Sequence, residues 1–178
     1  NDFELYLKNL SMYFSWKSYA LSKNIMQKDG SPIEDKNIKP LIFNFFENYT
    51  LKMKPVKDAK TTLDRLSLYY NIIILSNIPH EFYHQRIQAL KTININYFFI
   101  SNIGDKGKVV NKLTINNKNK CWFIDDSPLQ IISVNKEAPK VKTIHLVTNK
   151  KLLNLMKKNS YSFNTTENWK KLEQIIIN

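Results

Sequence analysis

Apolar residues follow a helical period through the first fifty residues of the chain. They recur at steps of three, four and seven positions, as Phe3, Leu7, Leu10, Phe14 and Leu21. A turn at residues 29–32 separates this stretch from a second one of the same period at residues 38–49, and Pro55 follows. We therefore predict that residues 1–54 form a helical segment without strands.

After Pro55 the pattern changes to short, continuous apolar runs that alternate with helical stretches. The runs predict strands at residues 71–77, 97–100, 121–125 and 141–147. The stretches predict helices at residues 56–69, 79–90, 106–113, 128–135, 151–156 and 167–176. Apolar strands that alternate with helices are typical of a parallel sheet with helices on both faces. We therefore predict an α/β fold with a Rossmann-like core over residues 55–178 and a small helical cap over residues 1–54.

The composition excludes several classes of protein. The 178 residues suit one domain, and no apolar run approaches the roughly 20 residues that a membrane span needs. A single cysteine, Cys121, excludes a disulfide framework and a cysteine-rich zinc site. Charged residues interrupt the first twenty positions, which is not the pattern of a signal peptide. We expect a soluble, cytoplasmic protein without a membrane partner.

The net charge of +12 does not by itself predict nucleic-acid binding. Only Arg65 and Arg86 among the 27 basic residues are arginine, the residue whose planar donors suit bases and phosphates. A positive field also attracts small phosphorylated molecules. We therefore expect a small phosphorylated substrate rather than a nucleic acid, and the sequence leaves the oligomeric state open.

Polar residues gather where two of the predicted strands end. Ser76 and Asn77 follow one strand, and Asp125 and Asp126 follow another. Ligands of open α/β sheets bind at the carboxyl ends of the strands. Adjacent carboxylates repel each other, and a cation between them relieves the repulsion; oxygen ligands of this kind suit Mg²⁺. The alternative is local: Asp126 or Ser127 caps the helix that Pro128 opens.

The order of these motifs resembles that of the haloacid dehalogenase-like (HAD-like) hydrolase superfamily, and an uncharacterised bacterial subgroup within it. In that superfamily a hydroxyl ends one strand, a lysine precedes a helix about thirty residues on, and a carboxylate pair ends a later strand. The matching segments are PVKDA (55–59), ILSN (74–77), DKGK (105–108) and FIDDSP (123–128). Residues 1–54 resemble the small cap that these enzymes insert after their first strand.

The resemblance implies a Mg²⁺-dependent phosphohydrolase, a phosphatase that acts through an aspartyl-phosphate. It implies that Ser76 and the N–H of Asn77 hold the phosphoryl oxygens. Lys106, with Lys108 as the alternative, neutralises negative charge. Asp126, together with Asp125, holds the metal ion.

The first motif of the superfamily, an Asp-x-Asp after the first strand, is absent from the 178 residues. That motif supplies the nucleophile, and its strand normally lies between those here at residues 72–75 and 121–125. The resemblance thus implies the strand order 98–100, 72–75, a vacant central position, 121–125, 143–147. Because the chain begins at Asn1 without a methionine, we expect a natural segment upstream that carries the motif. The alternative is a catalytically inactive binding or regulatory module.

A second motif competes for the chemistry of the chain. His80, Glu81 and His84 form a literal His-Glu-x-x-His, the signature of zinc hydrolases. Pro79 places His80 and Glu81 in the first turn of the predicted helix, whereas the signature lies within an established helix. A third ligand would have to be His145, in the middle of a predicted strand, or a distant carboxylate. Zinc hydrolysis is therefore the remote alternative.

Overall fold

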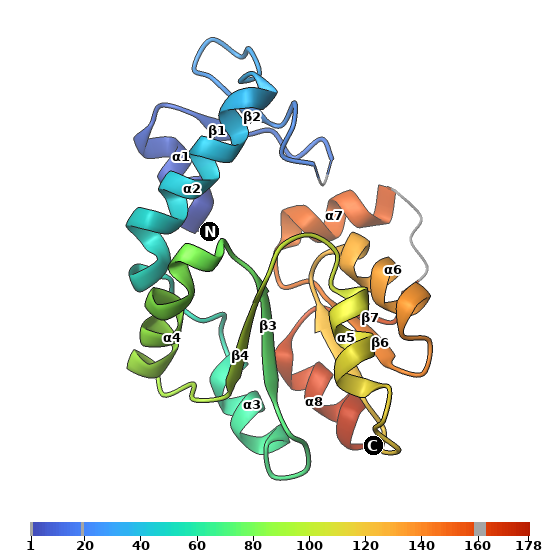
Figure 1. The fold of residues 1–178 in the computed structure, drawn as a ribbon. Helices are drawn as coiled ribbons and strands as arrows, with labels where there is room; N and C mark the ends of the chain where they lie inside the picture. Colours follow the sequence, from blue (N-terminus) through green and yellow to red (C-terminus); the bar gives the residue numbers. More distant parts are fainter. Residues whose placement is uncertain (1, 19, 159–162) are drawn as a thin grey trace.

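The computed structural model describes residues 2–18, 20–158 and 163–178, in which helices alternate with short strands (Figure 1). The helices are α1 (Asp2–Asn9), α2 (Ile38–Tyr49), α3 (Ala59–Leu66), α4 (Tyr83–Thr92), α5 (Gly107–Thr114), α6 (Pro128–Glu137), α7 (Lys150–Lys158) and α8 (Trp169–Ile177), with 3-10 turns η1 (Asp35–Asn37), η2 (Thr50–Lys52) and η3 (His80–Phe82). The strands are β1 (Tyr13–Phe14), β2 (Ile25–Met26), β3 (Ile73–Asn77), β4 (Phe98–Asn102), β5 (Trp122–Asp125), β6 (Lys142–Leu146) and β7 (Thr165–Thr166). None of the described helices has the length and apolar character needed to cross a membrane.

The strands after residue 55 form two small parallel sheets. β3 pairs with β4, and β5, β6 and β7 pair in that order. The predicted neighbours, 98–100 beside 72–75 and 121–125 beside 143–147, are confirmed. No backbone pairing joins β3 to β5 within the described residues, so the fold is mixed α/β with two separate parallel sheets. The short β7 was not predicted, because Thr165 and Thr166 have no apolar run around them.

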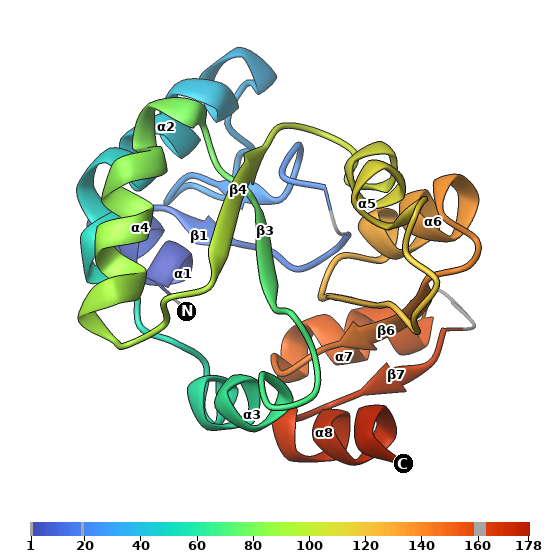
Figure 2. The same ribbon diagram turned by 60° about the horizontal axis from the view of Figure 1, so that its bottom comes forward.

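Helices cover both faces of the β5–β6 pair, as the apolar runs predict. Side chains alternate along a strand, so Phe123 faces one way and its neighbours Trp122 and Ile124 face the other. Phe123 packs with Val110 of α5 and residues of α6. Trp122 and Ile124 pack with the cluster formed by α3, α8 and β6. Figure 2 shows α5 and α6 on one side of β6 and α3 with α8 on the other.

The β3–β4 pair is covered less completely. Ile74 packs on the cluster that contains Phe99 and Phe82, which joins this sheet to η3 and α4. In contrast, Ile73 and its register partner Phe98 are 42% and 67% exposed. The expectation of helices on both faces is therefore wrong at this position. Residues of α5 and α6 pack on Leu75, further along β3, but do not extend over Ile73 and Phe98.

The segment before Pro55 contains a β-hairpin, which corrects the prediction of helices alone. α1 ends at Asn9, and antiparallel strands β1 and β2 follow. Residues from the helices and the hairpin line one cluster, whose buried members are Tyr6, Leu7, Ile25, Ile33 and Phe45. Apolar residues of α1, α2 and the hairpin all pack into this one cluster. The spacing of these residues was therefore read as a helical period although part of the segment is strand. Figure 1 shows this segment at one end of the molecule, above α4 and α7.

Two helix starts differ from the predicted ones for local reasons. The helix expected from residue 56 begins at Ala59, because Asp58 has a left-handed backbone with φ of 65°. The helix expected from Pro79 opens as the 3-10 turn η3, and α4 begins only at Tyr83. In contrast, α2 and the start of α6 at Pro128 lie where the sequence predicts them.

Candidate functional site

Polar residues end the parallel strands β3, β4 and β5. Ser76 and Asn77 of β3 stand in register with Ser101 and Asn102 of β4, and β5 ends at Asp125. The amide of Asn102 donates to Oδ1 of Asn77 over 2.8 Å. This pairing holds the two strand ends together and leaves Ser76, half-buried, one position earlier on β3.

A buried ion pair joins the start of α5 to the end of β5. Nζ of Lys106 lies 2.6 Å from Oδ2 of Asp125, and the two side chains are 10% and 8% exposed. Oδ1 of the same carboxylate accepts from the backbone N–H of Ser127 at 2.9 Å. Lys106, to which the resemblance gives a charge-neutralising role, is buried against the strand. Lys108, the alternative lysine, is exposed.

Close packing at Gly107 explains how Lys106 reaches the strand. The N–H of Gly107 donates to Oγ of Ser133 in α6 at 3.0 Å. A Cβ atom at position 107 would lie 2.3 Å from the carbonyl oxygen of Ser133, far inside normal contact distance. The first turn of α5 therefore approaches α6 as closely as only glycine allows, and Lys106 precedes it directly.

A hydrogen-bond network fixes the loop between β4 and α5. The carbonyl of Gly104 accepts from the side chains of Asn77 at 2.9 Å, Asn102 at 3.1 Å and Gln130 at 3.3 Å. Oε1 of Gln130 in turn accepts from the backbone N–H of Lys106 at 2.8 Å. Gly104 has φ of 82°, which glycine adopts without strain. The network joins the ends of β3 and β4 to α6 and to the backbone of Lys106, whose side chain in turn pairs with Asp125 of β5.

Asp126 differs from its neighbour, because among the described residues the ion pair with Lys106 is formed by Asp125 and not by Asp126. The residue has an exposed surface, yet the protein atoms around its carboxyl group, and then the charge of Asp125, raise its pKa. Its backbone carbonyl accepts from Nε2 of His145 at 2.8 Å. The site thus contains one carboxylate that is paired with a lysine, Asp125, and one whose ionised form is disfavoured, Asp126.

His145 was considered from the sequence only as a third zinc ligand, and its place beside the carboxylate pair was not predicted. It is 0% exposed on β6, opposite Asp125 in the strand register, and its Nδ1 has no partner among the described residues. Its bond to Asp126 orients the peptide that carries the second carboxylate. The available signal was a histidine within an otherwise apolar strand, next to the strand that ends in the carboxylate pair.

The capping alternative for the carboxylate pair is only partly correct. Ser127 occupies the N-cap position of α6, with Pro128 in the first turn, but its side chain makes no capping bond. Asp125 instead accepts the N–H of Ser127, which shapes the turn before the helix. Asp126 takes no part in this turn through its side chain, so capping does not account for it.

The described residues contain no group of three or more His, Cys, Asp or Glu side chains placed to hold a metal ion. This leaves the zinc alternative without a ligand set, and His80 is already engaged, with Nδ1 2.7 Å from Oγ of Ser101. His80 also lies in η3, outside α4, so His80 and His84 do not share one α-helix. Asp125 and Asp126 are likewise not part of a larger group of such side chains among the described residues.

Comparisons with known proteins assign no family to this constellation. No protein-family model, no curated protein and no solved structure matches the chain. The chemistry of the site is therefore argued from its own residues.

Proposed function

We propose that this protein is a HAD-like domain built for Mg²⁺-dependent hydrolysis of a small phosphorylated molecule. The observation that carries the proposal is the buried ion pair of Lys106 and Asp125, with Asp126 beside it, at the carboxyl end of a parallel strand. Phosphoryl transfer needs little more than charge neutralisation and positioning, so few residues suffice. The same three residues match the third and fourth motifs of that superfamily.

The phosphate side of the site consists of Lys106, Ser76 and Asn77. Lys106 supplies a positive charge held at a fixed place, which attracts a phosphoryl group and offsets its charge. Ser76, at the end of β3, offers a hydroxyl and precedes the Asn77 amide that the Gly104 network holds in place. An ester bound here would place its phosphoryl oxygens between the ends of β3 and β5.

Asp126 is the residue that fits a Mg²⁺ ion best. Its ionised form is disfavoured by its surroundings and by Asp125, and a nearby cation relieves both effects. Mg²⁺ binds through one or two carboxylates and completes its octahedron with water and phosphate oxygens, so a pair of carboxylates is an adequate protein contribution. When bound, the ion neutralises phosphoryl oxygens; Asp125 would serve as the second carboxylate, steadied by Lys106.

The finer fold that belongs to this proposal is a single Rossmann-like sheet. β3 and β5 each pair on one edge only among the described strands. Leu75 of β3 packs on the same cluster as Phe123 of β5, and Ile72, directly before β3, packs on the same cluster as Trp122 and Ile124. We propose that one further parallel strand lies between them and ends in the Asp-x-Asp nucleophile. Its first aspartate attacks phosphorus, the alcohol leaves, and water then hydrolyses the aspartyl-phosphate to release inorganic phosphate.

A catalytically inactive binding module is the second candidate. It is favoured by one observation, the lack of an Asp-x-Asp anywhere in the 178 residues. The gene sequence directly upstream of the Asn1 codon separates the two candidates. An Asp-x-Asp at the end of an apolar run supports the enzyme, and its absence from the gene product supports the module.

The ligand site itself is testable on the chain as given. We expect isothermal titration to show weak Mg²⁺ binding that Asp126→Asn lowers by about tenfold or more, as loss of a main ligand implies. His80→Ala is the matched control and leaves Mg²⁺ binding unchanged. Lys106→Gln lowers the affinity for inorganic phosphate. Zn²⁺ binding that is lost in His80→Ala and His84→Ala, but kept in Asp126→Asn, would overturn the proposal in favour of the zinc alternative.

A further inference from the structure

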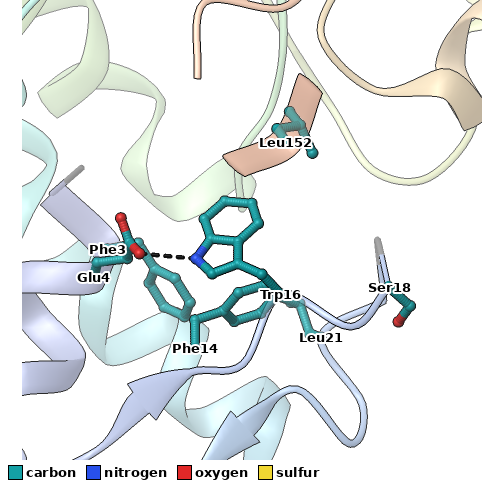
Figure 3. Close-up of a pocket in the computed structure, with 7 residues that line it drawn as sticks. All are labelled: Phe3, Glu4, Phe14, Trp16, Ser18, Leu21 and Leu152. Atoms are coloured by element: carbon teal, nitrogen blue, oxygen red, sulfur yellow. Dashed lines mark hydrogen bonds between the residues drawn. The ribbon is translucent and has the colours of Figure 1, made fainter. Parts of the chain in front are cut away.

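A small apolar pocket lies where the segment before Pro55 meets α7. Its volume is about 160 Å³. The wall is made by three aromatic rings, two leucines, one carboxylate and one serine: Phe3, Phe14, Trp16, Leu21, Leu152, Glu4 and Ser18. Figure 3 shows the indole of Trp16 at the centre of this lining, with Leu152 of α7 facing it from the other side. None of these residues belongs to the site at the end of β5.

The charged groups at the pocket are already engaged with one another. Oε1 of Glu4 accepts from Nε1 of Trp16 at 2.8 Å and from Nζ of Lys151 at 2.7 Å. The Lys151 ammonium also lies 5.8 Å from the centre of the Trp16 ring. The Glu4 carboxylate is therefore paired with a cation, and most of the remaining lining consists of apolar ring faces and leucine side chains.

The loop that carries Trp16 is built to hold this ring in place. Trp16 has φ of 54°, a conformation in which a bulky residue is strained. Asn24, 1% exposed, organises the loop from inside: Oδ1 accepts from Oγ of Ser15 and the N–H of Lys17, both at 2.8 Å, and Nδ2 donates to Oγ of Ser18 at 2.6 Å. The Trp16 ring also packs edge-on against Phe14, with centroids 4.9 Å apart. The wall of the pocket is thus preorganised at a cost in backbone strain.

We propose that this pocket binds one neutral aromatic ring of a small molecule. The size supports a single ring, because an engineered apolar cavity of about 150 Å³ binds benzene, whereas drug-sized ligands occupy pockets of about 300 Å³ or more. The lining supports an aromatic ring over an aliphatic one, because Phe3, Phe14 and Trp16 offer both faces and edges for ring contacts. The binding site is independent of the phosphate chemistry proposed above.

Benzyl alcohol, with cyclohexylmethanol as the aliphatic probe of the same shape, tests the proposal. We expect ¹H–¹⁵N NMR spectra to show saturable binding of benzyl alcohol at millimolar concentration, with a shift of the Trp16 indole resonance, which Trp16→Phe identifies. Aromatic contacts beyond burial should make benzyl alcohol bind about two- to tenfold tighter than cyclohexylmethanol.

Paired variants connect the binding to this pocket. Leu152→Asn places an amide in the wall, and Leu21→Ala removes part of it; each should weaken benzyl alcohol binding at least threefold. Leu129→Asn, on α6 and 60% exposed, is the control for an added amide and should leave the affinity unchanged. Equal affinity for the two alcohols, a lack of saturation, or equal effects of Leu152→Asn and Leu129→Asn would each overturn the proposal.

Discussion

Replacement of Gly107 by alanine tests how Lys106 is placed. The added Cβ would lie 2.3 Å from the Ser133 carbonyl oxygen and 2.6 Å from its Oγ. The shortest contact must lengthen by about 1 Å to reach the 3.4 Å of ordinary contact, which α5 achieves only by moving away from α6. Overpacking of this kind costs about 1–3 kcal/mol, and a buried N–H that loses the Ser133 hydroxyl costs about 1–2 kcal/mol more.

We therefore expect Gly107→Ala to lower the free energy of unfolding by about 2–5 kcal/mol, or the Tm by about 4–20 °C for a chain of this size. Urea denaturation followed by circular dichroism measures it. Ser133→Ala removes only the hydroxyl and should cost about 1 kcal/mol. Gly104→Ala meets no atom within 4 Å and carries only the strain of its φ of 82°, about 1–2 kcal/mol. A Gly107→Ala protein as stable as the wild type would refute the close approach and the position of Lys106 derived from it.

Three further variants test the electrostatics. Asp126→Asn should stabilise the metal-free protein slightly at pH 7, because burial and the charge of Asp125 raise the folded pKa of Asp126 and so disfavour its ionised form. Wild-type Asp126 is protonated below the ordinary carboxyl pKa of about 4, so the gain from the variant should vanish there in thermal melts. Glu4→Gln should destabilise the protein by about 0.5–1 kcal/mol at neutral pH. Burial opposes the ionisation of Glu4, yet hydrogen bonds from Lys151 and Trp16 hold its pKa at about 2. The stability difference between wild type and variant is therefore present above the ordinary pKa and disappears as the pH falls toward 2. Lys106→Met should cost about 3–5 kcal/mol in urea melts by leaving Asp125 buried and unpaired, and Lys106→Met with Asp125→Leu should regain most of that loss.

The parts of the fold that the sequence predicts are those in which local pattern and packing agree. α2 lies at Ile38–Tyr49 as predicted, because its apolar residues face one cluster. The parallel pairs β3–β4 and β5–β6 were predicted from continuous apolar runs. Such runs are typical of strands in parallel sheets, because helices pack on both faces of those sheets. The resemblance implies a charge-neutralising role for Lys106. The burial of Lys106 against Asp125 was not predicted, because it depends on how closely α5 packs on α6.

The parts that failed depend on contacts between distant residues. The buried side chain of Asn24 holds the loop of the β1–β2 hairpin by hydrogen bonds to Ser15, Lys17 and Ser18. The apolar periodicity of the sequence gives no sign of this role, because Asn24 is polar. The exposure of Ile73 and Phe98 cannot be read from their hydrophobicity, because it is set by where neighbouring helices end. His145 was dismissed as a residue in mid-strand, yet the parallel register with β5 places it against Asp126.

Stability alone does not account for the ion pair at the end of β5. Buried ion pairs are often matched or surpassed by apolar side chains of similar volume, because desolvation offsets their attraction. The contact of Gly107 with Ser133 and the bond from Lys106 N–H to Gln130 already fix the start of α5 without any charge. Asp126 follows the same strand end, in an environment that disfavours its ionised form, and His145 lies beside it on β6 with an Nδ1 that is buried without a described partner. Unfavourable polar features gathered at one place are expected where a protein binds a charged ligand, which is why the proposed function is placed at this end of β5.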